Sequence, residues 1–354
     1  MAYVFLEHPS SLEHITASRP ASSAMSVNPE QPTRIIAIER ELDARGWWGF
    51  ERVQAPPVQR SVLEAVHPAS HVAEIERFCA DGGGHLDDDT VVSVGSWEAA
   101  LHAAGGAVRM VDLLLDGDAA AGFCSLRPPG HHAMPDHAMG FCVFNNIAIA
   151  AKYAVEVRGL QRVMIFDWDV HHGNSTNAVF HADKSVLFAS IHQSPLFPGT
   201  GAADDVGEGD GIGFTVNLPV RAGSGDEVWL ALVEHVIVPL AFAFEPQLVL
   251  VSAGYDAHLE DPMADCNVTD AGFSAIAHAV AAACRELEAP LGAVLEGGYA
   301  LGTLARCVGT TLEAMSTLPG RKGQGPASLA HDARQRLAEW WPSLVAAGSS
   351  KHSR

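Results

Sequence analysis

Residues 163–174 read VMIFDWDVHHGN and join a short apolar run to a dense group of acidic and histidine side chains. The apolar run predicts a buried strand, and similar runs recur along the chain with longer Ala-rich segments of helical pattern between them. The expected strands are Tyr3–Leu6, Gly122–Ser125, Val163–Phe166, Val186–Ile191, Leu248–Val251 and Ala293–Leu295. The expected helices include Ser96–Leu115, Asn145–Val157, Asp226–Phe242 and Asp270–Glu288.

This alternation of strands and helices decides the fold class. Strands rich in Val, Ile and Leu that alternate with helices are typical of α/β proteins, in which helices cover both faces of a single, mostly parallel sheet. No glycine-rich linker divides the chain, so we expect one domain over residues 1–319. Residues 320–354 are expected to add a helix at 327–341 and a polar tail, packed on the same domain, and the Ser- and Pro-rich segment 17–33 is expected to be a long loop.

The charge of the chain excludes one class of partner and favours another. Its 22 Lys and Arg against 42 Asp and Glu leave a net charge of −20, which repels nucleic acid and attracts cationic partners. The first residues lack the basic region of a signal peptide, and no apolar stretch reaches the roughly 18 residues that span a bilayer, so we expect a cytoplasmic protein without membrane association. The six cysteines form no CxxC pair, which predicts reduced, buried thiols rather than disulfides.

Polar side chains with catalytic potential follow five of the expected strands. Open α/β sheets bind their ligands beyond the carboxyl ends of the strands. The groups at these ends are His131 with His132, the segment Asp167–His172, His192, Asp256, and Tyr299. We therefore expect one site at this edge of the sheet.

Asp169 and His171 have the spacing of metal ligands. In an extended segment alternate side chains share one face, so a carboxylate oxygen and an imidazole nitrogen can reach one metal ion, and Asp256 can supply a third ligand. Three N/O ligands with an open fourth position are typical of catalytic zinc, which lowers the pKa of a bound water to about 7. Tyr299 follows two glycines and can donate a hydrogen bond to a developing oxyanion.

His131 and His132 lie in a stiff loop, RPPGHH, and adjacent imidazoles beside a metal suit proton transfer near neutral pH. Each needs an acceptor for its far nitrogen, and Asp167 and Asn174 are the expected acceptors. Because an aspartate holds its imidazole cationic more readily than an asparagine does, the two histidines are expected to differ in pKa.

With these motifs the chain resembles the histone deacetylase superfamily, in particular its class II and bacterial deacetylase-like amidohydrolase branch, which is related to the acetylpolyamine amidohydrolases. The resemblance covers about residues 29–315. The motifs are RPPGHHA (127–133), MGFCVFNN (139–146), DWDVHHGN (167–174), FPGTG (197–201), SAGYDAHLEDP (252–262) and EGGY (296–299). The resemblance implies the arginase–deacetylase α/β fold and hydrolysis of an N-acyl group from an amine.

The resemblance also implies a role for each site residue. Zinc (or Fe²⁺) is placed on Asp169, His171 and Asp256, the general acid/base pair on His131 and His132 with Asp167 and Asn174 orienting them, and the carbonyl-polarising hydroxyl on Tyr299. A substrate tunnel is placed along Gly140, Phe141, Phe197, Met263 and Gly298. Structural K⁺ is placed on the side chains of Asp167 and Ser190 and the carbonyls of Asp169, His171 and Ile191. Arg34 resembles the arginine of an internal channel through which acetate leaves. The sequence does not assign the base and acid steps to one histidine or the other.

The substrate expected from this resemblance is a cationic acylated amine, either an acetyl-lysine peptide or an acetylpolyamine. Met263 stands seven positions after Asp256, where family members that prefer acetylpolyamines can carry Glu, and this favours acyl-lysine. Polyamine hydrolases of the superfamily also restrict access by long loops and dimerisation, so segment 17–33 or a homo-oligomer keeps the acetylpolyamine alternative open.

Two other functions are weighed against a deacylase. An arginase-type ureohydrolase needs two manganese ions and extra carboxylates, but this chain has Asn174 and His258 at the relevant positions. A non-catalytic acyl-lysine binder has no use for the complete set of metal and proton-transfer residues.

Overall fold

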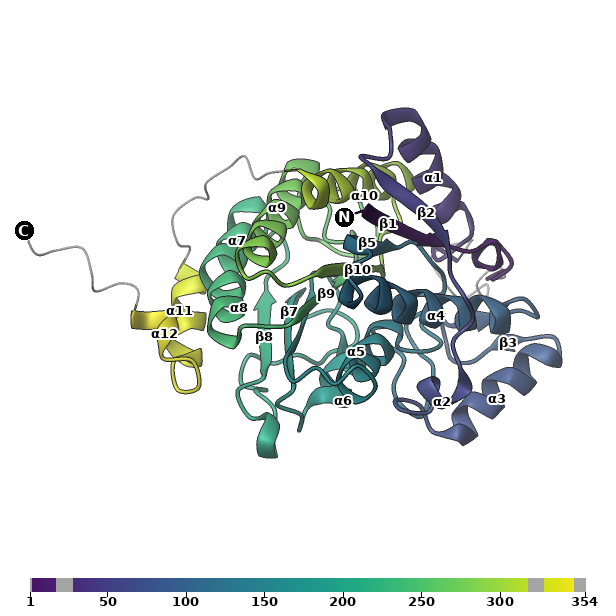
Figure 1. Cartoon of the computed structure of the whole chain (residues 1–354), viewed down its shortest axis with the longest axis horizontal. Helices are drawn as coiled ribbons and strands as arrows, with labels where there is room; N and C mark the ends of the chain where they lie inside the picture. The colour runs from purple at the N-terminus through teal and green to yellow at the C-terminus, as the bar shows by residue number, and fades with distance from the viewer. Residues whose placement is uncertain (1, 17–27, 318–327, 347–354) are drawn as a thin grey trace, which may run out of the picture.

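The computed structural model describes residues 2–16, 28–317 and 328–346 (Figure 1). Within them an eight-stranded sheet has the order β2-β1-β5-β10-β9-β6-β7-β8, and all neighbouring strands are parallel. Its strands are β1 Ala2–Glu7, β2 Phe50–Gln54, β5 Ala119–Cys124, β6 Val163–Asp167, β7 Val186–Gln193, β8 Thr215–Val220, β9 Leu248–Ala253 and β10 Leu291–Leu295; β3 (Gly84–His85) and β4 (Val91–Val92) form a separate antiparallel pair. The predicted parallel sheet and its six predicted strands are confirmed.

Helices cover both faces of the large sheet. Their bounds are η1 Pro9–Leu12, α1 Thr33–Arg45, α2 Arg60–Leu63, α3 Ala69–Ala80, α4 Ser96–Leu115, α5 Asn146–Glu156, α6 Asn174–Phe180, η2 Gly209–Gly211, α7 Asp226–Leu232, η3 Val233–Ile237, α8 Val238–Phe244, α9 Asp270–Glu286, α10 Leu301–Ser316, α11 Ser328–Leu337 and α12 Ser343–Ala346. One layer contains α1, α10, α9 and the α7–η3–α8 helix, and α10 packs against both α1 and α9 (Figure 1). The other layer contains α3, α4, α5 and α6.

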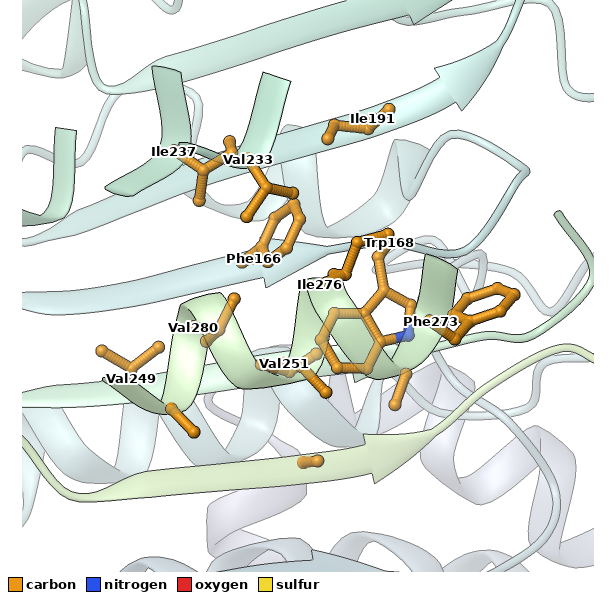
Figure 2. Close-up of a cluster of buried hydrophobic side chains, with 14 of the residues drawn as sticks. Phe166, Trp168, Ile191, Val233, Ile237, Val249, Val251, Phe273, Ile276 and Val280 are labelled. Atoms are coloured by element: carbon orange, nitrogen blue, oxygen red, sulfur yellow. The ribbon is translucent and has the colours of Figure 1, made fainter. Parts of the chain in front are cut away.

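The central strands are buried on both faces. Along β9, Val249 and Val251 belong to the apolar cluster beneath α9, which Figure 2 shows, whereas Leu248 and Leu250 belong to the cluster on the opposite face. Successive side chains of a strand point to opposite faces, so a strand between two helical layers needs apolar residues at every position. This explains the unbroken apolar runs that predicted these strands.

The two strands of the eight-stranded sheet that the sequence did not predict, β2 and β8, are its edges. In β2 only Phe50 is buried, so its sequence lacks an apolar run. In β8 the run is interrupted by Asn217 and by Pro219, a residue that sheets tolerate at edge strands because no partner needs its missing N–H.

The helix formed by α7, η3 and α8 corrects one expectation. Residues Asp226–Phe244 are long and apolar enough, by length and composition alone, to cross a membrane, although the sequence predicted no such stretch. Trp229, Val233 and Leu240 of this helix are buried in the apolar cluster between the helix layer and the sheet, and the helix packs against α9. These contacts are those of a core helix.

Helix α11 packs against α7 and η3, next to the β8 edge of the sheet. The Arg336 guanidinium donates to the backbone carbonyl of Asn217 on β8 (3.1 Å) and so satisfies an acceptor of the edge strand. This helix is shorter than the expected 327–341, and the expected polar tail and residues 17–27 of the expected loop lie outside the described residues.

A buried ion cluster joins the N-terminal segment to the loop before the tandem histidines. Arg127 donates to both carboxylate oxygens of Glu30 and to the backbone carbonyl of Ser11, and Arg34 donates to Glu30 at 3.2 Å. The side chains of Arg127, Glu30 and Arg34 are completely buried. Burial alone would raise the pKa of Glu30, but the Arg127 guanidinium outweighs it and lowers that pKa well below its usual range.

The Arg127→Met variant is expected to lose about 3–5 kcal/mol of stability, because it leaves a buried carboxylate short of a partner. Since the pKa of Glu30 is depressed in the folded protein, its stabilising contribution is present above the unfolded pKa and is lost as the pH falls through the lower folded value. In the variant the loss of stability on acidification should begin at a higher pH than in the wild type. Urea unfolding across pH 3–7 tests both expectations. The exposed ion-pair partner Arg60 gives the control, Arg60→Met, which should change little, and equal losses in the two variants would contradict the argument.

Candidate active site

The candidate site lies where the central strands β5, β10, β9, β6 and β7 end. These strands are consecutive neighbours in the parallel sheet, so the loops that leave their carboxyl ends meet at one edge. Asp167 at the end of β6 is paired in register with Ser190 of β7 and with Ser252 of β9. Residues more than 80 positions apart in the chain therefore become neighbours.

Asp169, His171 and Asp256 converge on a single point. Nδ1 of His171 lies 3.2 Å from Oδ1 of Asp169 and 3.1 Å from Oδ2 of Asp256. The three ligand atoms lie within 4.8 Å of one another, and all three residues are buried. The structure thus brings together the three residues that the sequence predicted as metal ligands.

Backbone amides hold the two carboxylates of this trio in place. Asp169 accepts from the N–H groups of His171 and Gly297 (both 2.8 Å), and Asp256 accepts from that of Val170 (2.9 Å). A Cβ atom at position 297 would lie 2.1 Å from Oδ2 of Asp256, so only glycine fits there. The loop after β10 therefore has to approach the trio through its backbone.

The electrostatics of the trio favour a bound cation. Burial and the neighbouring charge of Asp169 raise the pKa of Asp256. Burial disfavours the charged form of His171, yet the two carboxylates outweigh it and raise its pKa to about 10. Two buried carboxylates and an imidazole nitrogen aimed at one point are an N/O donor set that fits Zn²⁺ or Fe²⁺.

His131 is paired with Asp167, as predicted. Its Nδ1–H donates to Oδ2 of Asp167 (3.0 Å), and its Nε2 lies 3.9 Å from Oδ1 of Asp169. Burial lowers the pKa of His131, but Asp169, Asp167 and Glu296 outweigh it and raise the pKa to about 10. The surrounding carboxylates therefore favour the protonated form of His131.

His132 is paired with Asn174 and has the opposite electrostatics. Burial and the charges of His131 and His171 lower the pKa of His132 well below its ordinary value. The Asn174 amide nitrogen points to the sulfur of Met134 (3.1 Å), so its oxygen faces Nδ1 of His132 at 2.7 Å. His132 thus donates from Nδ1 and keeps a free lone pair on Nε2.

A cavity of about 230 Å³ leads to the trio. It is lined by Asp89, His132, Gly140, Phe141, His171, Leu196, Phe197, Met263 and Tyr299. The Phe197 ring meets the His132 ring edge-on at a centroid distance of 5.2 Å, and Phe141 meets Tyr299 at 5.7 Å. Gly140 has a positive φ of 59°, and a Cβ there would lie 2.6 Å from the His132 ring. Four of the five predicted tunnel residues therefore surround one cavity that contains His132, His171 and Tyr299.

Gly298, the fifth predicted tunnel residue, is not among the lining residues of this cavity. It is buried, and its carbonyl accepts a hydrogen bond from Nε of Arg34 (2.7 Å). The same guanidinium lies 5.0 Å from the centroid of the Tyr299 ring. Gly298 and Arg34 thus lie behind Tyr299, and Arg34 contacts the loop that carries it.

Ser190, predicted as a potassium ligand, lies beside Asp167. The Nε2–H of His192 donates to the carbonyl of Gly201 (2.9 Å), so Nδ1 of His192 must be an acceptor. The Ser190 hydroxyl, 2.9 Å away, donates to that nitrogen. Its oxygen lone pairs stay available to a cation, so the hydroxyl is compatible with the predicted role.

A second group in the described residues, His258, Asp270 and Cys307, also has ligand atoms within 4.8 Å of one another. Here Nδ1 of His258 accepts from the backbone N–H of Glu260 (3.1 Å), so its proton resides on Nε2 and is donated to Asp270 (3.1 Å). Arg306 also donates to the Asp270 carboxylate. A metal ion on Nε2 of His258 would have to displace the proton on that nitrogen and the Arg306 guanidinium on Asp270. We therefore interpret this group as a structural hydrogen-bond cluster.

Sequence reasoning missed the contacts of two residues of the site, Glu296 and Leu196. Glu296 is completely buried and accepts from the backbone N–H groups of Gly130 (2.7 Å) and His131 (3.2 Å), which fixes the histidine loop. Leu196 and Asp89 line the cavity. Glu296 and Leu196 lie inside or beside quoted motifs, but nothing in the residue types alone indicates these contacts.

Residues 28–315 match the family model described as the histone deacetylase domain. The chain is 38% identical over 301 residues to a probable deacetylase of Archaeoglobus fulgidus, covering 81% of this chain and 83% of the relative. It is 37% identical over 300 residues to the histone deacetylase-like amidohydrolase of Pseudomonas aeruginosa, covering 84% and 78%. The crystal structure of the HDA15 HD domain matches with a TM-score of 0.90 and 33% identity, covering 98% of this chain and 96% of that one. The likeness confirms the predicted arginase–deacetylase fold.

Proposed function

Because the chain belongs to the histone deacetylase family and is a hydrolytic enzyme of that family, we propose that it is a zinc-dependent deacylase that hydrolyses the acetyl amide of a lysine side chain. The observation that carries this proposal is one cavity lined by His171 of the trio, His132 and Tyr299 together with the rings of Phe141 and Phe197.

Asp169, His171 and Asp256 are the residues that would hold the zinc ion. A metal ion there would supply Lewis acidity, which polarises the acyl carbonyl and makes water a better nucleophile at neutral pH. The protein supplies the dry, preorganised surroundings, because the trio is buried and its carboxylates are fixed by backbone amides.

The two histidines take different roles in this proposal. His132 is neutral and has a free Nε2 lone pair, so it is the group that accepts a proton from the attacking water. In this proposal His131, paired with Asp167, carries the positive charge. That charge stabilises negative charge that develops on the substrate, and it lowers the proton affinity of His132. The protonated His132 then returns its proton to the leaving amine.

Tyr299 donates a hydrogen bond to the acyl oxygen as it gains negative charge. Burial raises the pKa of Tyr299 well above its ordinary value, so the phenol keeps its proton throughout the reaction. Potassium beside Asp167 and Ser190 is part of the proposal, because the Ser190 lone pairs are free to bind a cation.

The cavity favours a substrate with an alkyl stem. Phe141, Phe197, Leu196 and Met263 surround the stem with apolar surface, and none of the described lining residues is a glutamate that would pair with a second ammonium group. Asp89, which also lines the cavity, is an acceptor for backbone N–H groups or for a cation.

The proposal is tested by kcat/KM of the zinc-loaded enzyme on an acetyl-lysine peptide and on N-acetylputrescine, measured as free amine released. We expect a large preference for the peptide, because the apolar lining leaves the second ammonium of a diamine with Asp89 as its acidic partner among the described lining residues. A preference for N-acetylputrescine would replace the proposal by an acetylpolyamine amidohydrolase. Turnover of neither substrate would reject both.

A further inference from the structure

Asp261 connects two parts of the cavity that are far apart in the sequence. Its Oδ2 accepts from the backbone N–H groups of Tyr299 (2.6 Å) and Ala300 (3.0 Å), and its Oδ1 accepts from that of Met263 (3.0 Å). The residue is only 7% exposed. One buried carboxylate therefore fixes both the loop that carries the Tyr299 phenol and the loop that carries Met263, which lines the cavity.

The Tyr299 loop is held on both sides of the tyrosine. Before it, the N–H of Gly297 donates to Asp169 (2.8 Å) and the Gly297 carbonyl accepts from the backbone N–H of Tyr255 (3.0 Å), while Gly298 has a φ of +116°, a conformation that favours glycine. Arg34 holds the carbonyl of Gly298 on one side, and Asp261 holds the N–H of Tyr299 on the other. The direction of the Tyr299 side chain is set between these two anchors.

We infer that Asp261 is the positioning residue that holds Tyr299 in its catalytic orientation. It also fixes the cavity-lining residue Met263 relative to Tyr299. This inference rests on the proposed function of Tyr299 as the hydrogen-bond donor to the acyl oxygen. Asp261 is not among the residues that line the cavity, and its three hydrogen bonds all come from backbone N–H groups. The requirement is geometric, because a misdirected phenol cannot reach the oxygen whose charge it stabilises.

The test compares Asp261→Ala, which removes all three acceptor contacts, with Asp261→Asn, which keeps the size of the side chain but places an amide N–H against a backbone N–H. The matched control is Glu260→Ala, since Glu260 is the adjacent exposed carboxylate and binds Thr303 and Arg306 on the outer side. We expect kcat to fall about 10–100-fold in both Asp261 variants, the range typical of outer positioning partners, with KM and bound metal little changed.

Two readouts separate positioning from a general structural role. Amide hydrogen exchange of residues 297–301 should accelerate in Asp261→Ala but not in Glu260→Ala, and this holds whether or not the substrate is correct. In the Tyr299→Phe background the Asp261→Ala change should have no further effect on kcat, because the group it positions is gone. An equal loss of kcat in both backgrounds, or unchanged exchange at 297–301, would overturn the inference. If the wild-type enzyme turns over no acylated amine, the proposed function fails, while the exchange measurement still decides whether Asp261 holds the loop.

Discussion

Asp256→Asn is expected to abolish turnover and to remove the bound metal ion in the same step. An asparagine has no net charge, so the trio would keep one carboxylate, and the amide would place its N–H₂ group or a neutral oxygen where an anionic oxygen now faces His171 at 3.1 Å. In the proposed mechanism a metal ion would activate both water and carbonyl, so activity should fall to the background of the assay. Metal content by elemental analysis and free-amine release from an acetyl-lysine peptide measure the two effects.

The control for this variant is Asp265→Asn, which changes an exposed aspartate of the same loop. It should retain both the metal ion and the activity. If Asp256→Asn kept a full equivalent of metal and lost only activity, the ligand set would have to lie elsewhere. Full activity after dialysis against a strong chelator would equally contradict a metal-dependent reaction.

Tyr299→Phe is expected to lower kcat by about 10²–10³-fold, the usual loss on removing one oxyanion donor. The phenylalanine keeps the ring that packs against Phe141 and beneath the Arg34 guanidinium, so KM, metal content and thermal stability should change little. A loss in kcat without a loss in substrate binding is the signature of an interaction made mainly in the transition state. Steady-state kinetics on the acetyl-lysine peptide measures kcat and KM separately.

Tyr153→Phe is the matched control, because its hydroxyl donates to Asp112 on the outer helices, away from the cavity. It should keep wild-type kcat. Unchanged turnover in Tyr299→Phe would remove Tyr299 from the mechanism, and with it the inference drawn for Asp261.

The central fold could be predicted from the sequence because central strands carry their own signal. Burial on both faces requires unbroken apolar runs, as along β9, and such runs are easily recognised. The edge strands carry no such signal. Phe50 is the only buried residue of β2, and β8 contains a proline, so both are recognised only once their neighbours are in place.

The candidate site divides in the same way. Residues whose side chains perform chemistry, such as His131, Asp169 and Tyr299, are set apart by type and spacing, and long motifs surround them. Residues that act through backbone contacts lie in the same motifs, but their type and spacing do not indicate those contacts. Asp261 and Glu296 look like ordinary loop acids in the sequence, and only the fold shows that each binds backbone amides of a distant segment.

The place of β10 in the sheet sets the order in which the site can be completed. This strand, residues 291–295, is near the C-terminal end of the matched region, yet it lies between β5 and β9 in the middle of the sheet. Gly297, whose amide binds Asp169, and Tyr299, which carries the phenol, lie in the loop that directly follows β10. During synthesis, which proceeds from the N-terminus, Asp169, His171 and Asp256 all leave the ribosome before the strand that closes the gap beside them. A nascent chain that ends before residue 291 therefore has the three proposed metal ligands but a divided sheet, and we expect deacylase activity only after the last central strand has been inserted.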